Sequence, residues 1–240
     1  MIGYERLQKI LEYLELKRSA TVRELADALY VSEASVRRDI ASLESKGFVN
    51  KIYGGVILSK YRNEVVPVNL RDGEHSGVKD ELARRAAQMI KSGDTVIIDA
   101  SSTARRIVKY LGSVRDAKII TNNLRIFGEC QNPHIKLYCT GGTYSQSNHA
   151  LIGPAAENYL RSVSADLLFF SSQGVTEDGM ISDVSEEESS LRRVMLERAD
   201  KKFFLCDSSK IGVRKTFTLC HADSLDGVIC DKPLPWEQNK

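Results

Sequence analysis

Polar side chains follow five short apolar runs in the C-terminal two-thirds of the chain, and their residue types suit an anionic ligand. Hydroxyl, amide and glycine residues let a ligand approach the backbone closely. If the apolar runs are parallel strands, the clusters share one edge of a sheet, where α/β proteins bind ligands. The residues concerned are Asp99, Ser101, Ser102, Thr103, Thr121, Asn122, Gly141, Gly142, Ser171, Ser172, Asp207 and Lys210.

Residues 101–103 also precede a helical pattern, and the first N–H groups of a helix favour a phosphate or a carboxylate. Lys210 would add a counter-charge. The alternative is ordinary capping, because Ser, Thr, Asn and Asp are favoured where helices begin. All five clusters taken together favour an anion pocket, whereas the lack of G-x-G-x-x-G or a Walker lysine disfavours a nucleotide.

Strand and helix patterns alternate through this region. Strands are predicted at residues 95–99, 118–121, 135–139, 166–170, 202–206 and 227–230, and helices at 79–90, 104–111, 124–130, 155–161 and 187–199. Buried strands that alternate with helices indicate an α/β fold with a mostly parallel sheet covered on both faces.

The first sixty residues have a different pattern, with three short amphipathic helices and a hairpin. The first carries an apolar stripe over residues 7–14, and the second begins at Thr21, which forms a capping box with Glu24. Ser32 is the predicted N-cap of the third helix, and residues 48–57 form a small hairpin around a glycine pair. This order is typical of a winged helix-turn-helix, whose third helix enters the major groove of DNA.

The third helix and the wing supply the candidate DNA contacts. An arginine fork pairs with guanine or clamps a phosphate. The alternative is a three-helix bundle with a solvated charged face, and the nine basic and eight acidic residues of 1–57 do not decide between them. The close placement of two arginines away from the apolar stripe favours DNA binding. The candidate contacts are Ser32, Ser35, Arg37, Arg38, Lys51 and Tyr53.

Composition excludes several other classes of protein. The chain has 240 residues, 42% of them hydrophobic, with a net charge of +2, which fits neither a disordered tail nor a polybasic coat. No apolar run approaches the ~20 residues that span a bilayer. The N-terminus lacks a hydrophobic signal core, and the five cysteines form no C-x-x-C pair. We therefore expect a cytoplasmic protein with reduced thiols, no metal site and no cofactor.

The N-terminal motif resembles the DNA-binding domain of the DeoR family of bacterial transcriptional regulators. The family pattern V-S-x-x-[ST]-[IV]-R-R-D-L-x-x-L-E-x-x-G matches residues 31–47 with conservative changes, and a glycine pair follows at 54–55. The resemblance implies that Arg37 and Arg38 contact DNA. It also implies that Asp39 and Glu44 do not, and instead brace the arginines or the helix surface.

The resemblance continues through the C-terminal region. Family sensor domains are similar to ribose-5-phosphate isomerase and glucosamine-6-phosphate deaminase, with motifs that match residues 99–103, 121–123, 141–142 and 207–210. It implies that Ser102 and Thr103 bind the phosphate of a phosphorylated sugar. Asp207, Lys210 and Glu188 would face the rest of that ligand, and Lys79 would add positive charge.

Two serines depart from the family pattern. Ser101 and Ser171 stand where family members usually have glycine, and a backbone with positive φ at Ser101 would be strained. Either the pocket is reshaped for a different ligand or the inducer site has degraded, and the sequence leaves both open.

The sequence thus predicts a repressor of a carbohydrate-utilisation operon that responds to a phosphorylated sugar. Residues 1–57 would form the winged helix-turn-helix, 58–74 a linker and 75–240 the effector-sensing domain. One winged helix reads few bases, so a homo-oligomer, dimer or tetramer, is expected on double-stranded operator DNA.

Two alternatives remain at this point. One is a sugar-phosphate isomerase in which Asp99, Asp207, Glu188 and Lys210 serve as acid, base and cation. The other is a DNA-binding protein that ignores small molecules. No catalytic residue is assigned under the preferred hypothesis, since the four histidines have no metal-ligand spacing and no G-x-S-x-G elbow occurs.

Overall fold

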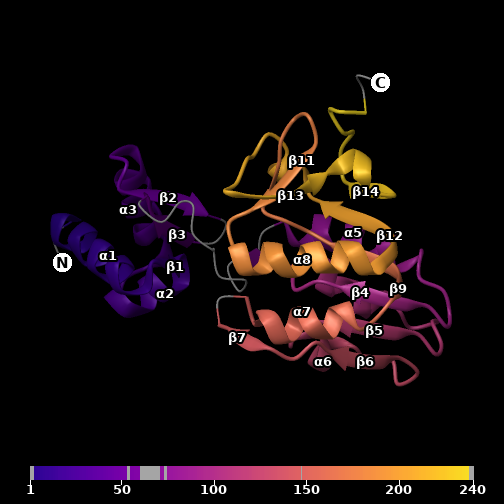
Figure 1. Cartoon of the computed structure of the whole chain (residues 1–240). Helices are drawn as coiled ribbons and strands as arrows, with labels where there is room; N and C mark the ends of the chain where they lie inside the picture. Colours follow the sequence, from indigo (N-terminus) through magenta and orange to yellow (C-terminus); the bar gives the residue numbers. More distant parts are fainter. Residues whose placement is uncertain (1–2, 53–54, 60–70, 73–74, 147, 238–240) are drawn as a thin grey trace. The chain divides into compact units, whose positions relative to one another are not determined.

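A computed structural model describes residues 3–52, 55–59, 71–72, 75–146 and 148–237, with side chains from Glu5 onward. The chain divides into two compact units, Met1–Glu74 and His75–Lys240, and each is considered by itself (Figure 1). The linker expected over residues 58–74 lies mostly outside the described residues and stays a prediction. No helix in the described ranges is long and apolar enough to cross a membrane.

The N-terminal unit contains the three predicted helices and the predicted hairpin. Thr21 Oγ1 accepts the N–H of Glu24 at 3.0 Å while the Glu24 carboxylate accepts the N–H of Thr21 at 2.7 Å, which confirms the capping box. Ser32 caps the third helix by accepting the N–H of Ser35 at 3.3 Å. The elements are α1 (Gly3–Lys17), α2 (Val22–Leu29), α3 (Glu33–Ser45), β2 (Val49–Ile52) and β3 (Gly55–Leu58).

A short strand between α1 and α2 is absent from the sequence prediction. Strand β1 (Ser19–Thr21) pairs antiparallel with β3 and completes a three-stranded sheet in the order β1-β3-β2. The polar residues after α1 predict only a turn. Three residues with one buried side chain, Ala20, are too few to show the alternation of apolar and polar residues that indicates a strand. The pairing requires glycine at Gly55, where a Cβ would overlap the carbonyl oxygen of Ala20.

The C-terminal unit is built on a six-stranded parallel sheet in the order β14-β12-β9-β4-β5-β6. All six predicted strands are present, which confirms the α/β fold class. Their bounds are β4 (Thr95–Ile98), β5 (Lys118–Thr121), β6 (Lys136–Cys139), β9 (Ala165–Phe170), β12 (Ala199–Cys206) and β14 (Gly227–Cys230).

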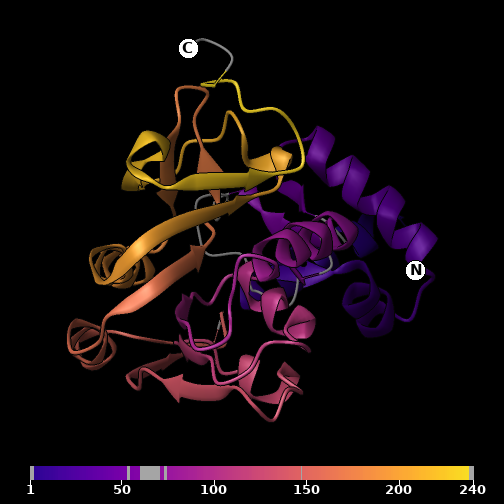
Figure 2. The same cartoon turned by 90° about the vertical axis from the view of Figure 1, so that its right-hand side faces the viewer.

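Helices cover both faces of this sheet, as Figures 1 and 2 show. Alternate side chains of β4 point to opposite faces, so Ile98 joins one core and Ile97 the other. On the Ile98 face lie α5 (Ser76–Ala87), η2 (Ala104–Tyr110) and α6 (Ile126–Glu129); on the Ile97 face lie α7 (Pro154–Arg161) and α8 (Glu186–Arg198).

The connections differ from the prediction in two respects. Residues 104–110 form a 3-10 helix where an α-helix was expected. Two small sheets of short strands are also present and were not predicted. They are β7 (Thr143–Ser145) with β8 (Ala150–Ile152), and β10 (Gly174–Val175) with β11 (Met180–Asp183) and β13 (Phe217–His221).

Candidate functional site

Helix α3 divides its two faces between the core and the surface. Val36, Ile40 and Leu43 are buried, whereas Arg37 and Arg38 are exposed on the other side. This division follows from the helical period, which places residues three and four apart on one face. The exposed face therefore presents both predicted DNA-contacting arginines.

Local contacts hold the two arginines loosely. Arg37 forms an ion pair with Glu33 one turn earlier, at 2.8 Å, and Arg38 donates weakly to Ser35 Oγ at 3.4 Å. Exposed pairs of this type contribute little to stability. Both guanidinium groups can thus leave these partners for a phosphate or a base edge without disturbing the fold.

Two acidic residues of α3 brace the domain. Asp39 is buried and holds Arg6 of α1 in a two-point ion pair. Glu44 accepts from Lys51 on the wing, at 2.6 Å from the amine and 3.1 Å from the backbone N–H. These contacts from Lys51 hold the pKa of the Glu44 carboxyl below its usual range. Glu44 therefore positions Lys51, while the other predicted wing contact, Tyr53, lies outside the described residues.

A groove of about 290 Å³ lies between α3 and the wing. Arg37 and Lys51 are the cationic residues of its lining, and most of the others are apolar. The lining residues are Val22, Arg37, Ile40, Lys51, Ile52 and Gly55. A basic groove beside a recognition helix suits a stretch of phosphate backbone.

In the C-terminal unit, the polar clusters follow the carboxyl ends of neighbouring parallel strands, as predicted. Asp99 to Thr103 follow β4, Thr121 to Asn123 span the end of β5, and Gly141 and Gly142 follow β6. Ser171 follows β9, and Asp207 to Lys210 follow β12. The sheet therefore brings these residues to one edge.

A buried arginine that the sequence analysis missed ties this edge together. Arg192 of α8 binds Asp99 at 2.8 Å, Asp183 at 3.0 Å and Glu188 at 3.0 Å. Burial would lower the pKa of Arg192, but the carboxylates of Asp183, Asp99 and Glu188 raise it above its ordinary value. The guanidinium is thus a permanent cation at the centre of three carboxylates.

The Arg192 cluster changes the interpretation of two predicted ligand contacts. Asp99 also accepts the backbone N–H of Ser101 at 3.0 Å, and Glu188 also accepts from Asn148. All four carboxylate oxygens of Asp99 and Glu188 therefore have protein partners. In this structure the two residues brace the edge, since a ligand would have to displace one of those partners. The sequence did contain one indication of this cluster: Glu188 and Arg192 are four residues apart, a spacing that allows an ion pair on one helix face.

A second charged group lies at the end of β12. Lys210 Nζ is 3.2 Å from Asp207 and donates to Ser171 Oγ at 2.7 Å. Burial would raise the pKa of Asp207, but Lys210, a hydrogen bond from Ser209 and the charge of Lys79 together lower it to about 2. Lys79 lies in α5 and is buried. The structure thus places Lys79, Asp207 and Lys210 within electrostatic reach of one another.

Both serines that replace family glycines have specific hydrogen bonds. Ser101 does not have positive φ, so the backbone strain considered for this position is absent. Its Oγ accepts the N–H of Ala104 at 3.1 Å. Ser171 donates to the carbonyl oxygen of Leu205 at 2.6 Å and accepts from Lys210. The loops are built around these hydroxyls, which favours a reshaped edge over a degraded one.

Three buried polar atoms at the ends of β4 and β5 have no hydrogen-bond partner among the described residues. They are Thr103 Oγ1, Asn122 Oδ1 and Asn123 Nδ2. Each residue is at most 3% exposed. Buried polar atoms without partners are costly and rare in native proteins, so these three atoms are candidates for contact with a ligand or a water.

Both glycines of the pair after β6 have a structural reason. Gly142 has φ of 119°, and a Cβ there would lie 2.6 Å from the carbonyl oxygen of Ile152. Gly141 has φ of 68° and faces open space. The close approach of β8 therefore explains Gly142, and a left-handed backbone explains Gly141.

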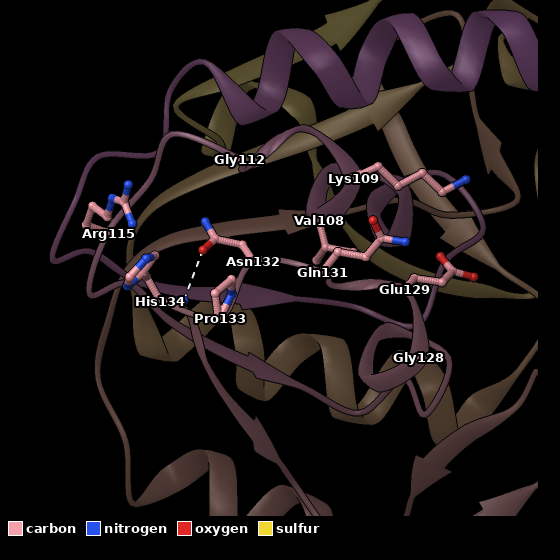
Figure 3. Close-up of a pocket in the computed structure, with 10 residues that line it drawn as sticks. All are labelled: Val108, Lys109, Gly112, Arg115, Gly128, Glu129, Gln131, Asn132, Pro133 and His134. Carbon is pink, nitrogen blue, oxygen red and sulfur yellow. Dashed lines mark hydrogen bonds between the residues drawn. The ribbon is translucent and has the colours of Figure 1, made fainter.

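The hollow drawn in Figure 3, about 730 Å³, lies away from these residues. Its lining includes Arg115, Asn132 and His134, which precede β5 and β6 and so lie at the opposite edge of the sheet. Asn132 bridges two loops there by donating to the carbonyl oxygens of Leu111 and Val114. A smaller hollow of about 220 Å³ includes Asp207 and adjoins the predicted edge.

Over the described part of the chain, no group of three or more His, Cys, Asp or Glu side chains is arranged to hold a metal ion. The cysteines described there are free thiols.

Two family models match the chain. One is described as the DeoR-like helix-turn-helix domain and matches residues 6–62; the other is the DeoR C terminal sensor domain and matches residues 74–232. The chain belongs to the DeoR family of transcriptional regulators. Membership confirms the prediction of a DNA-binding regulator and contradicts the isomerase alternative.

Relatives that match nearly the whole chain are named as transcriptional regulators or repressors. HTH-type transcriptional regulator GolR of Listeria innocua is 32% identical over 98% of this chain and 92% of its own. The lactose phosphotransferase system repressor of Staphylococcus epidermidis is 30% identical over 96% and 93%. HTH-type transcriptional repressor GlcR of Bacillus subtilis is 29% identical over 97% and 90%.

Solved structures show only a distant likeness to this DeoR-family chain. The full-length sorbitol operon regulator SorC from Klebsiella pneumoniae has a TM-score of 0.43 and 10% identity, with all of both chains covered. Ribose 5-phosphate isomerase A from Methanocaldococcus jannaschii has a TM-score of 0.42 and 16% identity, with 57% of this chain and 55% of the other covered. Likeness at this level supports no functional inference.

Proposed function

We propose that this DeoR-family regulator represses a carbohydrate-utilisation operon and that a phosphorylated sugar bound at the sheet edge modulates operator binding. Two similar proteins are named repressors, one of them of a lactose phosphotransferase system. Operator contacts are assigned to Ser32, Ser35, Arg37, Arg38 and Lys51.

The observation that carries the effector site is the set of orphaned polar atoms at the ends of β4 and β5. Thr103 Oγ1 can donate to a phosphate oxygen, Asn122 Oδ1 can accept from a sugar hydroxyl, and Asn123 Nδ2 can donate to one. Lys79 and Lys210 supply positive charge at the same edge. This complement of donors, one acceptor and cations fits a polyhydroxylated anion.

The same edge offers a route to regulation. Asp99 connects the loop of residues 99–103 to Arg192 of α8. Arg192 also binds Asp183 and so connects α8 to β11. A ligand at Thr103 would act on this ion cluster. In a dimer or tetramer, a change in how sensor domains associate would move paired recognition helices out of register with their half-sites.

The test is fluorescence anisotropy of the full-length protein on DNA from upstream of its own operon, at fixed salt. A panel of phosphorylated sugars and their unphosphorylated parents is titrated into the complex. We expect one phosphorylated sugar, and not its parent, to shift operator affinity. Tight binding that no compound shifts would contradict the effector site and leave a ligand-blind DNA-binding protein.

Thr103 allows a matched pair of variants. Thr103→Val removes only the orphaned hydroxyl, so we expect it to abolish the response to the phosphorylated sugar while operator binding persists. Thr103→Ser retains the hydroxyl and is expected to respond. Loss of both activities in Thr103→Val would instead indicate a folding role for the side chain.

A further inference from the structure

Tyr30, in the turn between α2 and α3, combines a strained backbone with a fully presented side chain. Its φ and ψ are 55° and 45°, in the left-handed region, and the residue is 94% exposed. Bulky residues rarely adopt this conformation, because it brings the Cβ of an L-amino acid too close to the following carbonyl oxygen. The phenol has no hydrogen bond to any described residue. Backbone N–H groups of Tyr30 and Val31 cap α2, but the phenol contributes no contact with a described residue that would offset the strain.

Exposure by itself would mean little, because single exposed aromatic residues are common on protein surfaces. The backbone conformation distinguishes Tyr30. His75, Asp116 and His149 also have positive φ, but they are of the polar types that tolerate it. The other exception is Arg18, whose carbonyl oxygen accepts the N–H of Leu58 within the small sheet.

Helix α3 ends in the same motif and provides the internal comparison. There the left-handed residue is Gly47, and the next residue, Phe48, donates to the carbonyl oxygen five positions earlier. At the end of α2 the left-handed residue is Tyr30, and Val31 donates to the carbonyl oxygen of Ala26 in the same way. Glycine is the usual residue at this position, since it lacks the Cβ penalty. Tyr30 thus occupies a position at which glycine would adopt the left-handed backbone with less strain.

The position of the turn gives the side chain a partner. In a helix-turn-helix the first helix crosses the DNA backbone and the second enters the major groove, so the turn between them passes the edge of the groove. Tyr30 lies two residues before Ser32, the N-cap of α3. Tyrosine hydroxyls are among the groups that bind phosphate oxygens in protein–DNA complexes.

We propose that Tyr30 is a DNA-backbone contact: its hydroxyl donates to a phosphate oxygen at the edge of the major groove, and its ring packs on the adjoining sugar. Residues held in unfavourable backbone conformations cluster at functional sites, and the left-handed turn projects the phenol into solvent. The contact orients α3 in the groove and carries no base preference of its own.

The test compares operator affinity, salt dependence and local stability in the full-length protein. Tyr30→Phe is expected to weaken binding about two- to tenfold, as for one neutral hydrogen bond, and Tyr30→Gly to weaken it further. The slope of log affinity against log salt stays unchanged, because a neutral donor releases no counterion, whereas losing a cationic phosphate contact lowers it by about 0.9. Hydrogen exchange over residues 22–45 should be no faster in Tyr30→Gly than in the parent.

Leu16→Ala is the matched control, because Leu16 is an exposed apolar residue on α1 of the same unit. Its operator affinity should equal that of the parent. Unchanged affinity in Tyr30→Gly would overturn the proposal, as would faster exchange over residues 22–45, which would make Tyr30 a structural residue. A change in sedimentation mass with unchanged DNA affinity would overturn it in favour of a contact with a second copy of the chain.

Discussion

The two predicted binding surfaces of this DeoR-family regulator have opposite characters. On α3, Arg37 and Arg38 are exposed and have weak local partners, whereas Asp99, Glu188 and Asp207 at the sheet edge are buried in ion pairs. DNA is a large polyanion that binds at the protein surface, so the side chains predicted to contact it are exposed and free to move. A small ligand is recognised by polar groups fixed in advance, which requires charges balanced inside the protein.

It follows that substitutions should separate the two regions cleanly. At the sheet edge they should change stability first, because each charge neutralises another in a low-dielectric environment. On α3 they should change DNA affinity and leave stability nearly untouched. The following predictions test this contrast, from the largest expected effect to the smallest.

Removal of Arg192 should have the largest effect. Arg192→Met leaves the carboxylates of Asp99, Asp183 and Glu188 buried without their common cation, which should cost about 3–5 kcal/mol of stability. Denaturant unfolding of the full-length protein measures it. Arg193→Met is the control, since the exposed Arg193 donates, among the described residues, to the carbonyl oxygen of Thr218 alone. Equal costs for both variants would contradict a central role for Arg192.

Arg37→Ala should weaken operator binding by about 1–3 kcal/mol if Arg37 makes a bidentate base contact, with stability changed by less than about 0.5 kcal/mol. Anisotropy titration on operator DNA and thermal unfolding provide the two readings. Arg161→Ala removes an exposed arginine of α7 that pairs with Glu157 at 3.0 Å, and its affinity is expected to stay near that of the parent. An Arg37→Ala variant with full affinity would remove this residue from the recognition surface.

Asp207 should make stability depend on pH in the acid range. Its pKa is about 2 in the folded protein and ~3.9 when unfolded, so its contribution is complete above pH ~4 and is lost as pH falls towards 2. The shift corresponds to about 2–3 kcal/mol. Unfolding of Asp207→Asn between pH 2 and 6 should lack this component, whereas Asp226→Asn should retain it. Parallel pH profiles for the parent and Asp207→Asn would contradict the assignment.

Ser171→Ala should have the smallest main effect of these variants, a loss of roughly 1 kcal/mol of stability for its hydrogen bonds. Because Ser171 Oγ fixes the amine of Lys210, its loss should raise the concentration of phosphorylated sugar needed for half-maximal response. Ser172→Ala is the neighbouring control, since Ser172 donates only to the carbonyl oxygen of Gly174. If the two variants respond alike, the Ser171 hydroxyl serves packing alone.

The N-terminal unit could be predicted almost entirely from sequence, because its signals are local. The capping box at Thr21 and the cap at Ser32 both involve residues three positions apart, and the apolar period separates buried Ile40 from exposed Arg37. Only β1 was missed, since its pairing with β3 joins segments more than thirty residues apart. The assignments to DNA contacts remain predictions.

The sheet edge was predicted in outline only. Alternating strands and helices indicate a parallel sheet, and a parallel sheet brings the residues that follow each strand to one edge. Which of these residues stay available to a ligand depends on side-chain partners from distant segments. Asp99 is satisfied by Arg192, 93 positions later, and Lys210 by Ser171, 39 positions earlier.

The sequence by itself thus determined the fold class, the regulator family and the edge at which polar residues gather, because these follow from local periodicity and short motifs. The tertiary structure decided how the charges at that edge are shared: Arg192 neutralises Asp99 and Glu188, and Thr103 is left without a partner. The physical reason is that buried charges must be balanced in space, and neighbours from distant segments, such as Arg192 and Asp99, leave no mark in sequence spacing.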